Sequence, residues 1–141
     1  MKKLPVAGII FLLVLPLLLT GCKQQAAKSI NITTDEFGQQ NNIVRSVELT
    51  QPGSLNVTLG ANPTTGYQWD EANIDDKTVI EQKSRNYVAP TATGVVGAPG
   101  KDVWVFNSLK AGTTTIHFGY SRPWEGGEKD SWTLVLNVTV K

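Results

Sequence analysis

Few side chains in this sequence have the types that catalysis needs, and none of them stands in a catalytic pattern. His117 is the only histidine of the chain. Thr115 and Gly119 flank it at a spacing of two, which indicates the outer face of a strand. A general base works beside a nucleophile and an orienting acid, and no such partners accompany this histidine. We therefore expect a surface histidine and a protein that is not an enzyme.

The acidic residues gather in three short clusters, at 70–71, 75–76 and 125–130. Paired carboxylates can bind calcium or serve a glycosidase, but none of these clusters has the spacing of a known metal loop. No glycine-rich loop follows a strand and opens a helix, as a nucleotide site would require. A formal net charge of +1 gives no support for nucleic-acid binding. We expect solvated turns, no metal and no cofactor.

The single cysteine, Cys22, follows an apolar stretch near the start of the chain. Lys2-Lys3 precedes an apolar run over residues 4–19, and Thr20-Gly21 supplies small residues before the cysteine. This order is typical of an export signal with a cleavage site. Leu19-Thr20-Gly21-Cys22 resembles a bacterial lipobox, in which the bond before the cysteine is cut and the thiol receives lipid.

Two interpretations of this stretch stay open. It could be an uncleaved membrane anchor, because the apolar run approaches the ~20 residues that span a bilayer. Pro5 and Pro16 interrupt the run, which favours cleavage and lipidation of Cys22. We then expect a signal peptide over 1–21 and an exported protein anchored at the periplasmic or cell-surface face of a membrane. A lipidated Cys22 leaves no thiol for nucleophilic chemistry or for a disulfide.

The rest of the chain predicts one small monomeric domain behind a polar segment. Residues 22–42 are rich in Gln and Asn, which is typical of a flexible tether. Ile32 and Phe37 are exceptions that could add a short strand. A chain of this size buries enough surface for one core and not for two. We therefore predict a single domain over 43–141.

Apolar residues after Ile43 recur with a period of two, the pattern of strands with one buried face. Leu134, Leu136 and Val138 share one face of the last run, for example. Turn signals such as Gly126-Gly127 separate the runs. We predict strands over 43–50, 54–60, 67–72, 79–88, 102–109, 113–120 and 131–141. About seven short strands in roughly 100 residues fit an all-β, immunoglobulin-like sandwich, here without a disulfide.

Three segments between these strands are more specific than ordinary connectors. Residues 62–67 (Asn-Pro-Thr-Thr-Gly-Tyr) combine a φ-fixing proline with a glycine that permits positive φ, which predicts a stiff tip. Arg122-Pro123-Trp124 carries the two side chains most enriched at binding hot spots, although Trp124 could equally fold back on the sandwich edge. Residues 94–100 are glycine-rich and uncharged; they could approach a partner through backbone, or have no role.

These segments resemble those of the chagasin-like inhibitors of papain-like cysteine peptidases. Residues 62–67 match that family's NPTTGY loop at every position, and Arg122-Pro123-Trp124 matches its RPW loop. Residues 97–100 lie where the family has GxGG, with Pro99 replacing a glycine and removing one backbone N–H. The order and spacing of the three blocks also match, so the resemblance covers residues 43–141.

The resemblance implies a sandwich whose three loops form a wedge that enters a peptidase cleft. Thr64 and Thr65 would lie near the partner's catalytic cysteine and histidine. Residues 94–100 would follow the unprimed side through backbone contacts, and Arg122-Pro123-Trp124 would pack on the primed side. Inhibition would be competitive, reversible and non-covalent. The implied peptidase-binding residues are Asn62, Pro63, Thr64, Thr65, Gly66, Tyr67, Gly97, Ala98, Pro99, Gly100, Arg122, Pro123 and Trp124.

An alternative hypothesis keeps the sandwich and drops inhibition. Because a fold does not fix function, the domain could be a non-inhibitory envelope module for adhesion or assembly. A buried Trp124 together with a disordered 94–100 loop would favour that alternative.

Overall fold

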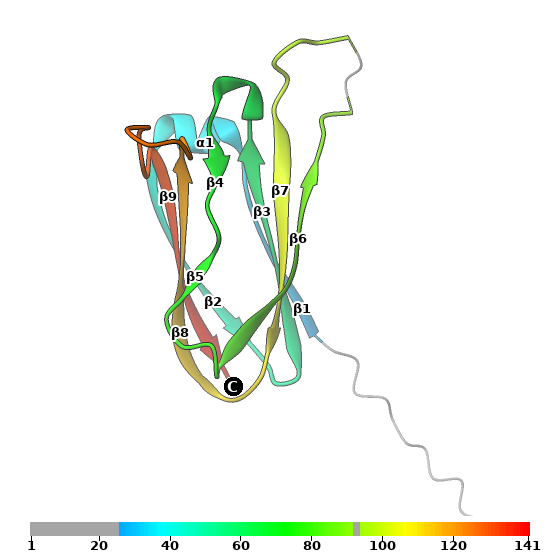
Figure 1. Cartoon of the computed structure of the whole chain (residues 1–141). Coiled ribbons are helices and arrows are strands. Elements are labelled where there is room, and N and C mark those ends of the chain that lie inside the picture. Colours follow the sequence, from blue (N-terminus) through cyan, green and yellow to red (C-terminus); the bar gives the residue numbers. More distant parts are fainter. Residues whose placement is uncertain (1–25, 92–93) are drawn as a thin grey trace, which may run out of the picture.

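The computed structural model describes residues 26–91 and 94–141, which form two β-sheets packed face to face (Figure 1). The elements are β1 (Ala26–Ile32), α1 (Thr34–Gln39), β2 (Asn42–Leu49), β3 (Gly53–Ala61), the 3-10 turn η1 (Pro63–Thr65), β4 (Gln68–Trp69), β5 (Asn73–Ile74), β6 (Ile80–Val88), β7 (Gly100–Ser108), β8 (Gly112–Ser121) and β9 (Trp132–Val140). One sheet has the order β1-β3-β7-β6 and the other β2-β9-β8-β4, with β5 paired to β8. The predicted all-β, immunoglobulin-like sandwich is confirmed.

The predicted strands agree with the structure apart from one segment. One strand was predicted over residues 67–72. The structure has two strands of two residues each in this region, β4 and β5. Elsewhere the predicted inward faces are buried, as Leu134, Leu136 and Val138 of β9 show. The alternating pattern thus located the core correctly wherever a strand was long enough to show a period.

Residues 26–42 belong to the sandwich, which differs from the flexible tether that their composition predicted. β1 pairs in parallel with β3, from Ala26 opposite Gly53 to Ile32 opposite Leu59. After it, the hydroxyl of Thr33 caps α1 by accepting from the Glu36 N–H at 3.2 Å. The predicted signal peptide and Cys22 lie outside the described residues.

Ile32, named as a residue that could add a short strand, ends β1. Hydropathy missed the rest of this edge strand because backbone pairing holds it. Most of its side chains are exposed, and Ile32 is the buried one. In the helix that follows, Phe37 is fully buried. Within residues 26–91 and 94–141, no helix is long and apolar enough to cross a membrane.

Phe37 begins a stack of four rings that we call the aromatic column. Its ring stacks on Trp132 at 5.2 Å, Trp132 on Tyr120 at 4.8 Å, and Tyr120 on Tyr67 at 5.5 Å, with interplanar angles of 10°, 9° and 19°. Each such pair contributes about 0.5–1.5 kcal/mol beyond burial. The column therefore ties α1 to the loop that follows β3.

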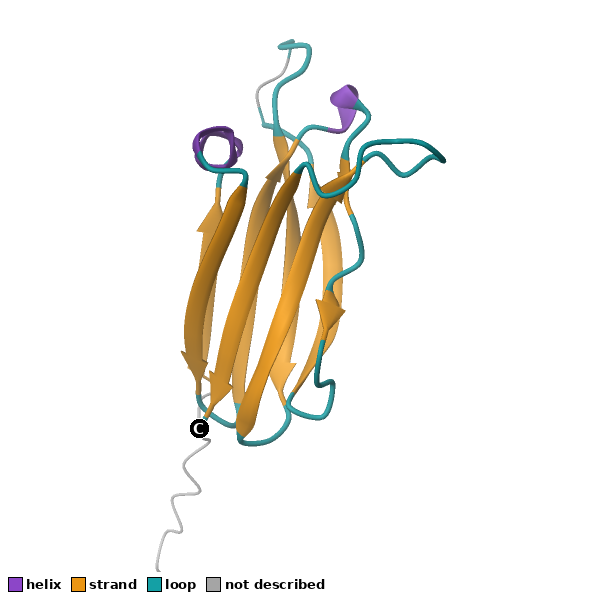
Figure 2. Cartoon of the chain, turned by 90° about the vertical axis from the view of Figure 1, so that its left-hand side faces the viewer, coloured by secondary structure: helices purple, strands orange, loops and turns teal. Residues whose placement is uncertain are grey.

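The two ends of the sandwich differ. One, the loop end, carries the connections β3–β4, β6–β7 and β8–β9 (Figure 2). The other, the turn end, carries the connections β2–β3, β5–β6 and β7–β8 together with the C-terminus (Figure 1). All three segments singled out in the sequence lie at the loop end.

Candidate functional site

The loop end brings the three predicted segments together. The connections that carry these segments are the first loop (residues 62–67), the second loop (89–99, described over 89–91 and 94–99) and the third loop (122–131); Gly100, the last residue of the predicted 94–100 segment, begins β7. The Asn62 side chain donates from Nδ2 to the carbonyl oxygen of Gly97 at 3.0 Å, which joins the first loop to the second. The indole of Trp124 lies against Gly66, which joins the first loop to the third. The three loops therefore form one continuous edge.

Asn62 organises the first loop. Its side-chain oxygen accepts from the hydroxyl of Thr64 at 2.6 Å. Its backbone carbonyl accepts from the hydroxyl of Thr65 at 2.6 Å and from the amide of the same residue at 3.2 Å. Gly66 then closes the turn at φ 82°, a left-handed conformation that glycine adopts without steric cost. The predicted stiff tip is present, with Thr64 and Thr65 exposed.

The third loop is held by its own hydrogen bonds. The Arg122 N–H donates to the Glu128 carbonyl at 2.8 Å, and the Gly127 N–H donates to the Trp124 carbonyl at 3.1 Å. The Lys129 ammonium group donates to the Arg122 carbonyl at 2.5 Å. These bonds fix the direction in which the loop presents its side chains.

Trp124 is half-exposed and half-covered by the first loop. Its side chain is 51% exposed, so it is not folded into the core. Its covered part lies over Gly66, where an added Cβ would stand 2.7 Å from the ring. Position 66 therefore needs a glycine for two reasons: its φ is positive, and the ring of Trp124 leaves no room for a Cβ. A half-exposed, fixed indole is a surface suited to contact a partner.

Arg122 and Tyr67 connect the first and third loops a second time. The Arg122 guanidinium carbon lies 4.5 Å from the centroid of the Tyr67 ring and 5.7 Å from that of Trp124. Cation–π contacts of this kind stabilise by about 0.5–1 kcal/mol at exposed sites. The phenol of Tyr67 also donates to the carboxylate of Glu128.

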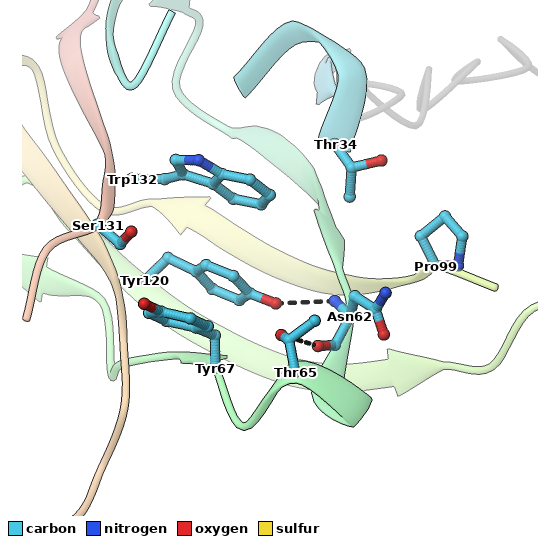
Figure 3. Close-up of a pocket in the computed structure, with 8 residues that line it drawn as sticks. All are labelled: Thr34, Asn62, Thr65, Tyr67, Pro99, Tyr120, Ser131 and Trp132. Carbon is cyan, nitrogen blue, oxygen red and sulfur yellow. Dashed lines mark hydrogen bonds between the residues drawn. The ribbon is translucent and has the colours of Figure 1, made fainter. Parts of the chain in front are cut away.

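The aromatic column supports the loops from below. The phenol oxygen of Tyr120 accepts from the Asn62 N–H at 2.8 Å (Figure 3). Burial raises the pKa of Tyr120, and the hydrogen bond to Glu128 raises the pKa of Tyr67. Both phenols are therefore neutral near pH 7, and Tyr67 keeps its proton for the bond to Glu128.

A hollow of about 270 Å³ lies between α1, the first loop and the aromatic column (Figure 3). Its lining residues come from every side of the loop end: Thr34, Asn62, Thr65, Tyr67, Pro99, Tyr120, Ser131 and Trp132. Tyrosines are the titratable groups among these eight residues. The lining therefore lacks the pair of acid and base that catalysis would require.

The second loop is built more openly in the part that the structure describes. Gly94 and Gly97 have φ values of 87° and 80°, and an added Cβ at either would meet nothing within 4 Å. Val95 and Val96 are 61% and 100% exposed. At its base, Gly100 lies so close to the Tyr87 phenol that no Cβ would fit. The tip of this loop therefore projects into solvent above a closely packed base.

The other candidates lie elsewhere. His117 is exposed on β8, as predicted, and its Nε2 lies 3.4 Å from a carboxylate oxygen of Asp75. Among the residues that the structure describes, no group of histidine, cysteine and acidic side chains could hold a metal ion. Sequence reasoning missed Tyr120 and Glu128 as supports of the loops. Strand alternation could have placed Tyr120 inside, whereas nothing local marks Glu128.

Comparisons with known proteins agree with this geometry. A family model described as "Chagasin family peptidase inhibitor I42" matches residues 48–138, which contain all three loops. Amoebiasin-2 of Entamoeba histolytica is 37% identical over 89 residues, covering 62% of this chain and 70% of that protein. Chagasin of Trypanosoma cruzi is 30% identical over 83 residues, covering 55% of this chain and 72% of that protein.

A solved structure agrees as well. The crystal structure of the cysteine protease inhibitor EhICP2 from Entamoeba histolytica superposes with a TM-score of 0.63 at 29% identity, covering 80% of this chain and 96% of that one. The family consists of peptidase inhibitors and not of enzymes. The matched residues span nearly two thirds of the chain, so this protein belongs to the chagasin family of peptidase inhibitors.

Proposed function

We propose that this protein inhibits papain-like cysteine peptidases by filling their active-site cleft with its loop end. One observation carries the proposal. Gly66 and Trp124 lock the first and third loops into a single edge before any partner arrives. An edge fixed in advance loses little conformational entropy on docking, so less of the free energy of its contacts is offset by ordering. The half-exposed Trp124 also gives no support to a non-inhibitory envelope module, which a buried Trp124 would have favoured.

Each loop has its own role in the proposed complex. Thr64 and Thr65, at the exposed tip of the first loop, would approach the catalytic cysteine and histidine of the peptidase. Arg122-Pro123-Trp124 would pack on the primed side of the cleft, and the backbone of residues 94–100 would follow the unprimed side. Three loops of this size can bury the ~1,600 Å² of a standard interface.

The chemistry of the tip determines the mode of inhibition. Its exposed groups are hydroxyls and a proline ring, none of which is an electrophile that a thiolate could attack. Binding is therefore non-covalent and reversible. Because the tip occupies the site where substrate binds, inhibition is competitive.

Titration of the 23–141 fragment against papain, with a fluorogenic substrate, tests this function. We expect stoichiometric inhibition that more substrate relieves. The double variant Thr64→Ala/Trp124→Ala should abolish inhibition and leave the thermal unfolding midpoint nearly unchanged, since all the removed atoms are exposed or half-exposed. An absence of inhibition by the unaltered fragment at micromolar concentration would refute the proposal.

We also propose that the protein is exported and held at the periplasmic or cell-surface face of a membrane by lipid on Cys22. The support is sequence: the charged start, the apolar run and the Leu19–Cys22 motif. A lipoprotein carries several acyl chains, which together anchor stably, whereas a single chain does not. The unaltered protein should therefore incorporate labelled fatty acid and lose residues 1–21, and the variant Cys22→Ser should take up no label. An unaltered protein that carries no label and keeps residues 1–21 would favour the uncleaved anchor instead.

A further inference from the structure

The position of β1 determines where the chain enters the sandwich. Ala26 pairs with Gly53, next to the β2–β3 turn, and β1 then runs parallel to β3 toward the first loop. The N-terminus of the described chain is therefore at the turn end, beside the C-terminus (Figure 1). Lys141 confirms this placement, because its carbonyl accepts from the Gln51 N–H in the β2–β3 turn at 3.0 Å.

The loop end lies one strand length away from this entry point. β3 runs over the nine residues Gly53–Ala61, and Asn62 of the first loop follows directly. At about 3.3 Å per residue, β3 separates the entry point from the loop end by roughly 26 Å. Whatever holds the chain by its N-terminus therefore holds it by the end opposite the inhibitory edge.

The spacer before this entry point is short. Three residues, Lys23 to Gln25, separate Cys22 from Ala26. Fully extended, the four Cα steps from Cys22 to Ala26 span at most about 14 Å. The tether of 22–42 predicted from composition would have reached much farther, but β1 and α1 take up most of it. The spacer is thus about half as long as β3.

The length of the spacer excludes one orientation at the membrane, in which the loop end points into the bilayer that holds the anchor. Exposed apolar side chains gather at the loop end, with Val95, Val96 and Trp124 among them, and such a tip could enter a bilayer. A chain held at Cys22 cannot stand inverted, with its loop end in the same bilayer and its turn end away from it, because the spacer of about 14 Å is shorter than the roughly 26 Å of β3. Leu109, in the β7–β8 connection, is an exposed apolar residue at the turn end.

We propose that the anchored protein stands with its turn end toward the bilayer and its loop end away from it, and that its partner is a papain-like peptidase dissolved in the aqueous compartment. The inference rests on the proposed inhibition and on an N-terminal anchor. The length argument applies to lipid on Cys22; an uncleaved apolar run over 4–19 would leave residues 20–25 as the spacer, which span about 25 Å when extended, nearly the length of β3. A peptidase attached close to the same membrane surface would lie below the inhibitory edge.

Energy transfer to labelled lipid headgroups tests the orientation directly. Cys22 is the only cysteine of the chain, so a dye on Lys110→Cys at the turn end or on Glu125→Cys at the loop end is placed uniquely in the lipidated full-length protein. On phosphatidylcholine–phosphatidylglycerol vesicles we expect strong transfer from Lys110→Cys and weak transfer from Glu125→Cys. Inserting a 20-residue Gly-Ser spacer after Gln25 should make the two signals similar. Equal transfer without that spacer, or no vesicle binding at all, would overturn the proposal.

Inhibition on the same vesicles tests the choice of partner. Dissolved papain should be inhibited by the vesicle-bound protein within about twofold of the 23–141 fragment in solution, because tethering changes no contact when geometry permits engagement. Inhibition in solution that is lost on vesicles would refute the outward orientation. If neither form inhibits papain, the proposed function fails, whereas the energy-transfer result still decides the orientation.

Discussion

The first and third loops are built differently from the second, although all three lie at one end of the sandwich. Hydrogen bonds to Asn62 brace the first loop, and Trp124 covers its Gly66. In the described part of the second loop, Gly94 has open space around it and Val96 is fully exposed. One region is fixed before binding, and the other has room to move.

The first and third loops are suited to provide affinity, and the second loop is suited to adapt to different partners. A fixed edge binds without an ordering cost, whereas each mobile side chain that is immobilised costs about 0.5–1.5 kcal/mol. An open loop can, however, adjust to clefts of different shape. We therefore expect changes in the fixed pair of loops to weaken inhibition far more than matched changes in the second loop.

Gly66→Ala should disturb the contact between the first and third loops more than any other single substitution. The new Cβ costs about 1–2 kcal/mol in the left-handed conformation and stands 2.7 Å from the ring of Trp124, which must move. Displacing one hot-spot residue typically costs 2 kcal/mol or more of binding, so we expect the inhibition constant for papain to rise by about 100-fold. Steady-state inhibition measures this change.

Gly94→Ala is the matched control. Its φ of 87° imposes a similar backbone cost, but the added Cβ meets nothing within 4 Å. We expect the inhibition constant to change by less than about threefold, because a strain present in both the free and the bound state cancels in the affinity. Equal losses in the two alanine variants would show that backbone strain matters and the contact with Trp124 does not.

Asn62→Ala cuts the hydrogen bond between the two regions. It removes the donor to the Gly97 carbonyl and the acceptor of the Thr64 hydroxyl. At about 1 kcal/mol for each hydrogen bond, we expect a five- to thirtyfold weaker inhibition. Amide hydrogen exchange of the second loop should become faster.

Thr64→Val separates the two bonds lost in Asn62→Ala. It removes the hydroxyl donor to Asn62 and leaves the bond to Gly97 intact. Exchange in the second loop should then stay at its original rate. Unchanged exchange in Asn62→Ala would contradict the idea that this side chain steadies the second loop.

The sequence predicted the parts of this architecture that depend on local pattern. Strand faces follow from alternation, as the buried Leu134 and Leu136 of β9 illustrate. The stiffness of the first loop follows from Pro63 and Gly66, whose backbone preferences do not depend on the rest of the fold. Such features need information from a few neighbouring residues only.

Long-range features escaped prediction for the same reason. β1 is stabilised by pairing with β3 while most of its side chains face solvent, so hydropathy could not separate it from a tether. The half-exposed state of Trp124 depends on Gly66, which is 58 positions earlier in the chain. Composition left that question open, and the contact between the two loops answers it.

Tyr67→Phe should have the smallest effect on inhibition. It tests a single hydrogen bond between the first and third loops. It removes the phenol that donates to Glu128 but keeps the ring that stacks on Tyr120 and lies under the Arg122 guanidinium. Because an exposed hydrogen bond contributes little net free energy, we expect the inhibition constant to change by less than about threefold at pH 7.

The pH dependence of stability distinguishes this hydrogen bond from a passive contact. The bond to Glu128 raises the pKa of the Tyr67 phenol above its ordinary value of 10.0, so the folded state favours the protonated form. Its stabilising effect is complete below pH 10.0 and is lost as the pH rises through the raised pKa. Urea midpoints should therefore fall more steeply above that pH in the unaltered protein than in Tyr67→Phe. Tyr120, whose pKa burial raises, is present in both proteins and cancels, so parallel curves would mean that the phenol of Tyr67 does not help to hold the first loop to the third.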